Sequence, residues 1–283
     1  MKNLISSWFR VDSRALGIYR ILIGWVCVLD IIRRWNYIDV FYSEQGIPMH
    51  SDSKAFNIFD YIGNGSLETH IVFLIGILFS ITLMIGYKTK LSQLITTIII
   101  IGIHSQAVQV GNSGDTFLNS MLIWTLFLPL GKSFSLDSLI KSLKEFKELK
   151  VEDLNNRIDG INKPTQIYSI AYFAVLLQIS AIYFLSAINR MDASNWKDGT
   201  AFYKMHQLDG FITSFGYYVR EYINYPISKM FTYSTLYLEY SILFLLLIPF
   251  YSHILRLFAI IPLTIFHLMI RLTMHVGLFS QIM

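Results

Sequence analysis

The chain has 283 residues, of which 54% are hydrophobic and only 15% are charged. Because soluble domains are about one quarter charged, this composition excludes a disordered chain and argues against an ordinary soluble one. The single cysteine, Cys27, excludes an intramolecular disulfide and a cysteine-cluster metal centre. The net charge of +4 is compatible with basic cytoplasmic loops, so we expect no nucleic acid partner.

Seven apolar segments are candidates for membrane-spanning helices, since a spanning helix needs about 20 mainly apolar residues. The segments are 15–33, 68–87, 91–110, 116–131, 166–187, 231–250 and 254–274. We therefore predict an all-α polytopic transmembrane helix bundle of seven, or eight, spanning helices. It is expected to form a single domain over 1–283 with no C-terminal soluble domain.

The first segment and the distribution of basic residues predict the topology. Arg20 lies inside the first apolar segment and no small-residue cleavage site follows, which indicates a retained helix rather than a signal peptide. If the N-terminus is placed in the cytoplasm, the cytoplasmic loops carry more lysine and arginine than the loops on the opposite side, as is usual for membrane proteins. The short turn with Lys88 and Lys90 then lies on the cytoplasmic side and agrees with this orientation. We predict a multi-pass protein with a cytoplasmic N-terminus.

The segment 132–163 is expected to be a cytoplasmic amphipathic loop. Leu139, Ile140, Leu143 and Phe146 fall on one face of a helix between charged residues. This pattern is typical of a helix that lies on the cytoplasmic leaflet, with membrane lipid as its partner.

Ionisable residues inside the apolar segments are candidates for function because burying a charge in a bilayer is costly. Arg20 and Glu239 would neutralise each other, so we expect a structural ion pair between them. Asp30 precedes Arg33 and Arg34 by three and four residues, which predicts a local pair.

Histidines in the apolar segments leave two interpretations open. Steps of four predict that His267, Arg271 and His275 share one helix face, which would bind an anion or move protons, or would only make polar contacts in the bundle. His104 is expected to be a hydrogen-bonded histidine of the bundle. The hydrolase, NTPase, dinucleotide and zinc motifs are absent, and no metal site is predicted.

Three groups of segments together resemble a known family. They are 14–24 with 30–35 and 41–46; 111–115 with 128–137; and 183–191 with 196–201 and 206–209. The chain is similar in this order to the HTTM-domain membrane proteins, the bacterial relatives of vitamin K-dependent gamma-glutamyl carboxylase. The string from Trp196 to Ala201 (Trp-Lys-Asp-Gly-Thr-Ala) is the most specific part of the resemblance.

The resemblance implies a reduced quinone of the vitamin K type as cofactor and a site on the non-cytoplasmic side of a bacterial cell membrane. In the carboxylase, oxidation of the quinol to its epoxide generates a base that removes a proton from a peptide glutamate, and carbon dioxide then adds. The implied catalytic candidates in this chain are Arg190, His206, His267 and Asp192. The implied substrate-binding candidates are Arg33, Asn112, Asp115, Trp196 and Arg271.

Two departures from the family weaken the catalytic expectation. Arg190 stands where the carboxylase has its catalytic lysine, and because arginine stays protonated it would hold an anion rather than act as a base. A base would then come from His206, His267 or Asp192. The chain ends at Met283, where family members continue into another apolar stretch, so it either lacks that helix or is a fragment. Peptide docking would use the segments 34–67 and 188–230 or another subunit.

Three functional hypotheses remain open. The first is a membrane enzyme that acts on a quinol or modifies a peptide. The second is a non-enzymatic membrane component that assists the maturation, export or immunity of a secreted peptide, with an accessory membrane subunit as partner. The third is a transporter, which ranks last because no inverted repeat is visible.

Overall fold

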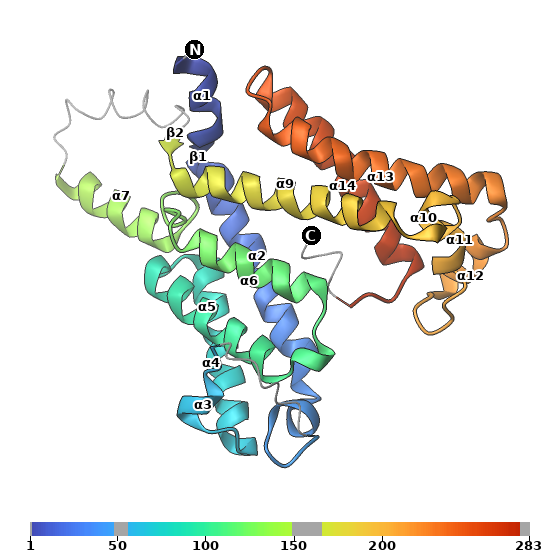
Figure 1. Cartoon of the computed structure of the whole chain (residues 1–283). Coiled ribbons are helices and arrows are strands. Elements are labelled where there is room, and N and C mark those ends of the chain that lie inside the picture. The colour runs from blue at the N-terminus through green and yellow to red at the C-terminus, as the bar shows by residue number, and fades with distance from the viewer. Residues whose placement is uncertain (1, 48–55, 149–165, 278–283) are drawn as a thin grey trace. The chain divides into compact units, whose positions relative to one another are not determined.

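The computed structural model describes residues 2–47, 56–148 and 166–277 (Figure 1). Their contacts divide the chain into two compact units. The N-terminal unit is Arg10–Ala171, and the C-terminal unit combines Met1–Phe9 with the chain from Tyr172 onward. Each unit is described separately below.

Helices dominate the described chain, which confirms the all-α prediction. Five of them are long and apolar enough to cross a membrane: α2 (Ser13–Trp35), α4 (Ser66–Ile85), α9 (Ile170–Met191), α13 (Tyr225–Leu247) and α14 (Ser252–Thr273). They correspond to five of the seven predicted segments. The β-strands in the described residues are β1 (Arg10–Asp12) and β2 (Gln166–Tyr168), which pair antiparallel with Val11 opposite Ile167.

The two other predicted segments also form helices, but they are shorter or more polar. Helix α6 (Ser113–Thr125) has 13 residues. Its length is about 20 Å at the rise of an α-helix, against a hydrocarbon core of about 30 Å. Helix α5 (Thr89–Gln106) buries polar residues such as Gln93 and His104. A count of seven or eight spans therefore remains a prediction.

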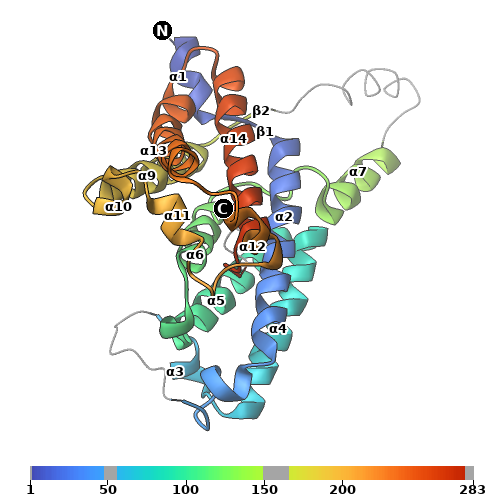
Figure 2. The same ribbon diagram turned by 90° about the vertical axis from the view of Figure 1, so that its right-hand side faces the viewer.

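The N-terminal unit is built on the close packing of α2 against α4, which lie side by side in Figure 2. A β-carbon at Gly24 of α2 would lie 3.0 Å from Cβ of Met84 and 3.1 Å from its backbone. A β-carbon at Gly76 of α4 would lie 2.9 Å from Ile31 and from Ile99. Small residues at such positions let membrane helices approach closely.

Arg20 of α2 binds the carbonyl end of α4, and Glu239 pairs with Arg190 instead, so the predicted ion pair between Arg20 and Glu239 is wrong. The Arg20 side chain is fully buried, and Nη1 donates to the carbonyls of Leu83 (2.7 Å) and Met84 (2.6 Å), while Nη2 donates to that of Phe134. A guanidinium at a helix C-terminus satisfies carbonyls that lack intrahelical partners and complements the helix dipole.

Short elements connect the helices of the N-terminal unit along the chain. They are the π-helix η1 (Ile38–Tyr42), α3 (Phe59–Ile62) and the 3₁₀ helix η2 (Val108–Val110). Helix α7 (Leu136–Glu148) occupies the predicted amphipathic segment, and residues 149–163 of that segment lie outside the described residues. In Figures 1 and 2, α7 extends away from the other helices of its unit.

The C-terminal unit packs α13 against α14, with α9 against both. Its buried core contains Tyr183, Ile242, Leu246 and Ala259. The short helices α10 (Ser194–Lys197), α11 (Ala201–Met205) and α12 (Ser214–Arg220) connect α9 to α13. Helix α1 (Lys2–Phe9) belongs to this unit because the Trp8 ring stacks on Phe173 and its Nε1 donates to the carbonyl of Leu247 at 2.6 Å.

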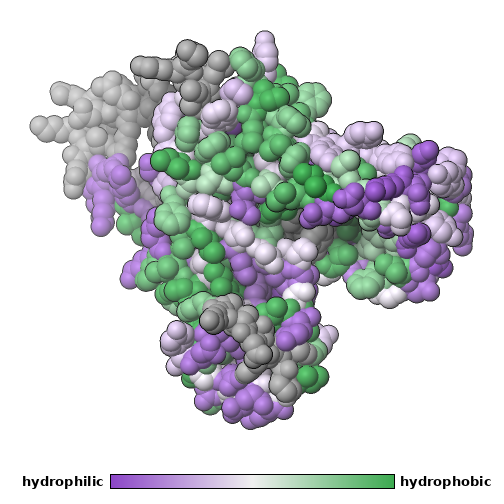
Figure 3. All heavy atoms as spheres, viewed as in Figure 1, coloured by the Kyte–Doolittle hydropathy of each residue, from purple (hydrophilic) through white to green (hydrophobic). Residues whose placement is uncertain are grey.

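Large apolar side chains remain exposed on the outer faces of the long helices. On α14 these include Phe258, Ile261, Leu268 and Leu272. In Figure 3, hydrophobic residues cover much of the long-helix surface, while hydrophilic residues gather over the short helices α10–α12 and around α3. Exposed apolar surface of this extent suggests that lipid, rather than water, surrounds the long helices.

Candidate functional site

Arg190 and Glu239 form a buried ion pair in the C-terminal unit. Nη1 of Arg190, at the end of α9, donates to Oε1 of Glu239 on α13. The Glu239 side chain is 3% exposed and that of Arg190 is 36% exposed. The Arg190 guanidinium also lies 4.9 Å from the centre of the Trp196 ring, a cation–π distance. The structure thus brings two predicted site residues, Arg190 and Trp196, together with Glu239.

This pairing limits what Arg190 does chemically. Arginine remains protonated in proteins, and here its charge is balanced by a carboxylate that solvent hardly reaches. An anionic ligand would have to share the guanidinium with Glu239. The arrangement therefore favours a positioning or structural role over general base chemistry.

His267 lies in the buried core beside Tyr183. Its Nε2 shares a hydrogen bond of 2.8 Å with the hydroxyl of Tyr183, and both side chains are about 5% exposed or less. The predicted face of His267, Arg271 and His275 does not extend to its last member, because α14 ends at Thr273. Sequence periodicity cannot locate that end, since no glycine or proline marks it.

His206 follows α11 and is fully buried. Its Nδ1 lies 2.9 Å from the carbonyl of Phe202, so Nδ1 donates and Nε2 carries the lone pair. Nε2 is buried and has no hydrogen-bond partner among the described residues. Burial lowers the pKa of His206, although the bond to Phe202 opposes this, and the neutral imidazole is favoured. His206 therefore has an unprotonated ring nitrogen, and burial makes the protonation of that nitrogen unfavourable.

An apolar pocket of about 330 Å³ lies within the C-terminal unit, beside these residues. Its walls come from α10, α11, α12, α13 and α14, and include the aromatic side chains of Trp196, Phe202, Phe231 and Phe266. Three hydroxyl-bearing residues of α13 also line it: Thr232, Ser234 and Thr235. The hydroxyls of Thr232 and Thr235 donate to the backbone carbonyls of Gly199 and Phe231. The lining contains no ionisable side chain. Pockets of this size and composition are typical of sites for apolar ligands with a few polar contacts.

Pro262 on α14 lines the same pocket. A proline inside a helix has no backbone N–H and clashes with the preceding turn, which bends or loosens the helix there. The proline therefore offers a local reason why α13 and α14 leave space at this level instead of packing closely.

The candidate polar residues do not line the pocket, but each is the sequence neighbour of a residue that does. Leu238 lines the pocket and Glu239 is the next residue; Phe266 and His267 are related in the same way, and so are Met205 and His206. Consecutive residues of a helix point about 100° apart, which explains this division. Trp196 belongs to both groups, because it lines the pocket and stacks on Arg190.

Two further candidates lie outside this arrangement. The Asp192 side chain is 95% exposed and faces Lys197 at 3.5 Å, so nothing in its surroundings adapts it to catalysis. Arg271, at the end of α14, donates to the carbonyl of Gly277 at 3.4 Å. The structure does not bring either residue to the pocket wall.

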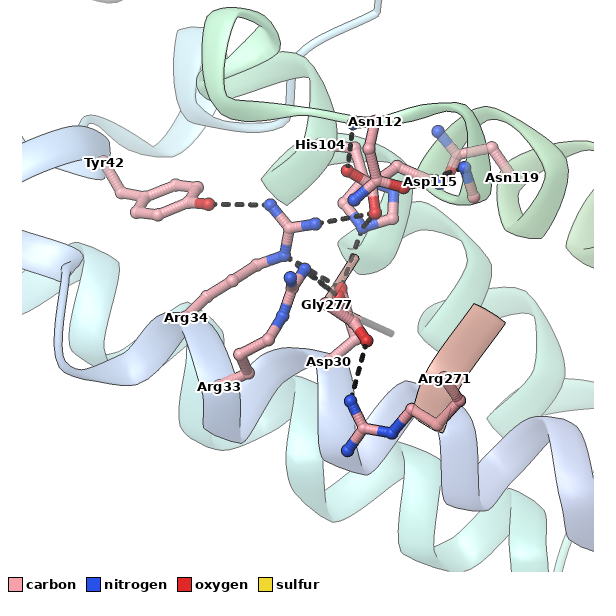
Figure 4. Close-up of polar contacts among 11 residues, drawn as sticks. Asp30, Arg33, Arg34, Tyr42, His104, Asn112, Asp115, Asn119, Arg271 and Gly277 are labelled. Atoms are coloured by element: carbon pink, nitrogen blue, oxygen red, sulfur yellow. Dashed lines mark hydrogen bonds and ion pairs between the residues drawn. The ribbon is translucent and has the colours of Figure 1, made fainter. Parts of the chain in front are cut away.

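A second cluster of predicted residues forms a buried polar network in the N-terminal unit (Figure 4). Asp30 accepts hydrogen bonds from Arg33 (3.0 Å) and Arg34 (3.0 Å), which confirms the predicted local pairs. Arg34 also pairs with Asp115 at 2.8 Å and donates to the Tyr42 hydroxyl at 2.8 Å. The network connects α2 with η1 and α6.

His104 completes this network, as expected for a bundle histidine. Its Nε2 lies 2.8 Å from Oδ2 of Asp30 and its Nδ1 lies 2.8 Å from Oδ1 of Asn119. Tyr42 and Asn119 were not predicted, because nothing in their local sequence indicates a buried polar partner. Their contacts arise only from the tertiary packing.

Asn112 and Asp115 have structural roles that compete with substrate binding. Oδ1 of Asn112 accepts from the N–H of Gly114, and Oδ2 of Asp115 accepts from the N–H of Asn112. These contacts form a capping box at the start of α6. Asp115 is also paired to Arg34. Among the predicted binding residues of this network, Arg33 has a partly exposed side chain, at 36%, and its guanidinium bonds Asp30.

The same network places possible metal ligands together. Three residues, Asp30, His104 and Asp115, each offer one donor atom, and these three atoms lie within 4.8 Å of one another. However, Arg34 contacts both carboxylates, and Arg33 contacts Asp30. Two guanidinium groups balance the two carboxylates, so the donor set does not fit a divalent cation and we assign no metal here.

Comparison with known proteins finds no family model, no curated protein and no solved structure that matches this chain.

Proposed function

We propose that this protein is a multi-pass protein of a bacterial cell membrane that binds a reduced quinone in the pocket of its C-terminal unit. The observation that carries the proposal is the apolar pocket of about 330 Å³, which is lined by Trp196. The ring of Trp196 makes a cation–π contact with the Arg190 guanidinium. The resemblance to HTTM-domain proteins adds quinol-linked oxidation or peptide modification on the non-cytoplasmic side, with a cytoplasmic N-terminus.

The pocket's composition supports a quinone as occupant. A quinone combines a flat ring and an isoprenoid chain with two oxygen atoms. Aromatic side chains such as Phe202 and Phe231 suit the ring, and the Ser234 hydroxyl suits an oxygen. In this reaction the neutral His206 is the residue we propose as proton acceptor. Arg190 would orient an anionic group of the substrate with the guanidinium that it shares with Glu239.

A specific observation favours the second hypothesis, a non-enzymatic membrane component for the maturation, export or immunity of a secreted peptide. The pocket lining has no ionisable side chain, and Arg190 is neutralised by Glu239. A protein built this way would bind an apolar ligand or an apolar peptide segment without turning it over. A secreted peptide or an accessory membrane subunit is then the proposed partner.

Quinone bound to the purified protein tests the proposal. Met269 lines the pocket on α14 and is 41% exposed, while Leu272, three residues later and 45% exposed, does not line it. Met269→Trp should fill the pocket and remove bound menaquinone, whereas Leu272→Trp should retain it. Bound quinone is measured by mass spectrometry of extracts after reconstitution with menaquinol.

Turnover separates the two hypotheses. Oxygen consumption with menaquinol, measured with and without a glutamate-containing peptide, should be lost in His206→Gln if the protein is an enzyme. Quinone that binds at stoichiometric level without oxygen consumption in the unmodified protein would support the non-enzymatic component. Binding that is equal in Met269→Trp and the unmodified protein would refute the pocket assignment.

A further inference from the structure

Helix α7 presents an apolar face that none of the described residues of its unit covers. Five large apolar residues of α7 are exposed, between 38% and 58%: Leu136, Leu139, Ile140, Leu143 and Phe146. At 100° per residue they occupy one side of the helix. In water such a face would be unfavourable, since each of these side chains gains free energy when it is removed from water.

The start of α7 is fixed at a membrane end of the N-terminal unit. Asp137 accepts from the N–H groups of Lys88 (2.9 Å) and Thr89 (2.8 Å) and from the Thr89 hydroxyl (2.7 Å), and its own N–H donates to Gly86. These residues form the turn between α4 and α5. Because α4 is long enough to span a membrane, its end marks the level of the bilayer surface.

Two further contacts hold the same segment against α2. The Ser133 hydroxyl donates to that of Ser13 at 2.8 Å, and the Phe134 carbonyl accepts from the buried Arg20. The beginning of α2 and the end of α4 therefore meet the start of α7. A helix anchored at this level, with an uncovered apolar face, lies where the headgroups of a bilayer meet its acyl chains.

The charges around α7 indicate the kind of lipid. Six lysines lie in the α4–α5 turn and in the segment 132–148, against three acidic residues. The lysines are Lys88, Lys90, Lys132, Lys141, Lys144 and Lys147. Asp137 is already bound to the backbone of α5, and Glu145 lies 3.8 Å from Lys141, so the local excess is positive.

An open hollow of about 500 Å³ beside the start of α7 is lined by three of these lysines, Lys88, Lys90 and Lys132. Nζ of Lys90 is committed to the carbonyls of Leu126 and Leu128, at 2.8 Å each. Lys88 and Lys132 are exposed at the rim. This position suits the phosphate of a lipid whose acyl chains would pass along the apolar face of α7.

We propose that α7 and the α4–α5 turn form a docking site for anionic phospholipid on the surface of the protein's own membrane. The apolar face of α7 enters the acyl-chain boundary, and the lysines at its edge and in the turn contact lipid phosphates. Lysine suits this place because its aliphatic stem covers apolar surface while its ammonium group reaches the headgroups. The site is independent of the quinone pocket.

The test uses the full chain reconstituted in phosphatidylcholine nanodiscs with or without phosphatidylglycerol. In a Cys27→Ala background, a nitroxide label is placed at Leu143→Cys on the apolar face or at Lys141→Cys on the polar face. We expect oxygen to relax the label at position 143 more than a water-soluble nickel complex does, and the reverse at position 141. Anionic lipid should increase this difference.

Charge variants test the role of the lysines. Replacing Lys132, Lys144 and Lys147 by glutamine should abolish the effect of phosphatidylglycerol. The ratio of docked to undocked α7 should fall about fivefold for each lysine removed, which is equivalent to about 1 kcal/mol each. Replacement of the same three residues by arginine is the matched control and should retain the effect. Circular dichroism and size-exclusion chromatography check that every variant folds.

Three results would overturn the proposal. A label at position 143 that the nickel complex reaches as easily as at position 141 would place α7 in water. A label protected from both reagents would show that a protein partner or a second copy of the chain covers the face. Embedding that is equal in both lipid compositions and unchanged by glutamine would remove the anionic lipid from the assignment.

Discussion

The buried ion pair between Arg190 and Glu239 supports a quantitative prediction. Arg190→Met leaves the carboxylate of Glu239, which is 3% exposed, without a charged partner. Removing one member of a buried pair typically costs about 3–5 kcal/mol of stability, because the remaining charge stays desolvated or must take up a proton. We expect a loss of about 3 kcal/mol for this variant, near the lower limit, because Arg190 itself is partly exposed.

The converse variant should be milder. Glu239→Gln leaves Arg190 36% exposed and still stacked on Trp196, so solvent and the ring compensate its charge. Its expected cost is about 1 kcal/mol, the size of one hydrogen bond. The double variant Arg190→Met with Glu239→Gln contains no buried charge and should lose about 1 kcal/mol as well, well below the sum of the single losses.

The measurement is reversible unfolding in mixed detergent micelles, followed by the helical circular dichroism signal at neutral pH. A second pair in the same unit provides the control. Lys197 and Asp192 lie 3.5 Å apart with side chains 59% and 95% exposed. The corresponding cycle of Lys197→Met and Asp192→Asn should give a coupling energy of about 0.5 kcal/mol or less, as is usual for exposed pairs.

Additive losses would refute this reasoning. If the double variant lost as much stability as both single variants together, Arg190 and Glu239 would contribute independently and the pair would not be the source of the cost. A loss below about 1 kcal/mol for Arg190→Met would show that Glu239 readily finds another partner or a proton. In that case Arg190 would be free for an anionic ligand, and the enzymatic hypothesis would gain support.

Three further predictions follow from the N-terminal unit. Arg20→Met should destabilise the protein by several kcal/mol because it leaves buried carbonyls without donors, at about 1–3 kcal/mol for each group, whereas Arg20→Lys should retain part of the stability in the same unfolding assay. Gly24→Ala should cost about 1–3 kcal/mol because its β-carbon would lie 3.0 Å from Met84, while Gly210→Ala, where no atom lies within 4 Å, should have little effect. Burial raises the pKa of Asp137, but the hydrogen bonds from Thr89 and Lys88 outweigh burial and hold that pKa below the ordinary value of 3.8. The ionised carboxylate therefore stabilises the folded protein fully above that value, and this stabilisation is lost as the pH falls further. Acid unfolding of Asp137→Asn should lack this pH-dependent component.

The long helices were predictable because length and apolar composition alone decide whether a segment can span a membrane. The ends of the shorter helices were not. The predicted segment 116–131 continues to Gly131, whereas α6 ends at Thr125 and its first residues lie before the predicted start. Residues at both ends of this stretch bind the rest of the unit: Asp115 pairs with Arg34, and the carbonyls of Leu126 and Leu128 accept from Lys90. Such tertiary contacts leave no periodic signal.

Partners of buried charges were predictable only when they were local. The spacing of three and four residues between Asp30 and its two arginines on one helix fixes their geometry, and those pairs were predicted. For Arg20 and Glu239, the sequence shows only that each charge needs compensation. It cannot show that Arg20 finds it at the carbonyl end of α4, because unsatisfied carbonyls at a helix end carry no mark in the residue types.

The pocket explains why functional residues are hard to identify in this chain from the titratable groups alone. The titratable groups that attract attention in the sequence, Glu239 and His267, are turned toward the core, and their neighbours Leu238 and Phe266 face the pocket. A ligand in the pocket would meet aromatic and aliphatic side chains first, and its nearest contact with a charge would be through Trp196, whose ring lies against Arg190. Substitutions of the lining, such as Met269→Trp, should therefore change ligand binding more than substitutions of the buried titratable groups, which act through their neighbours in the wall.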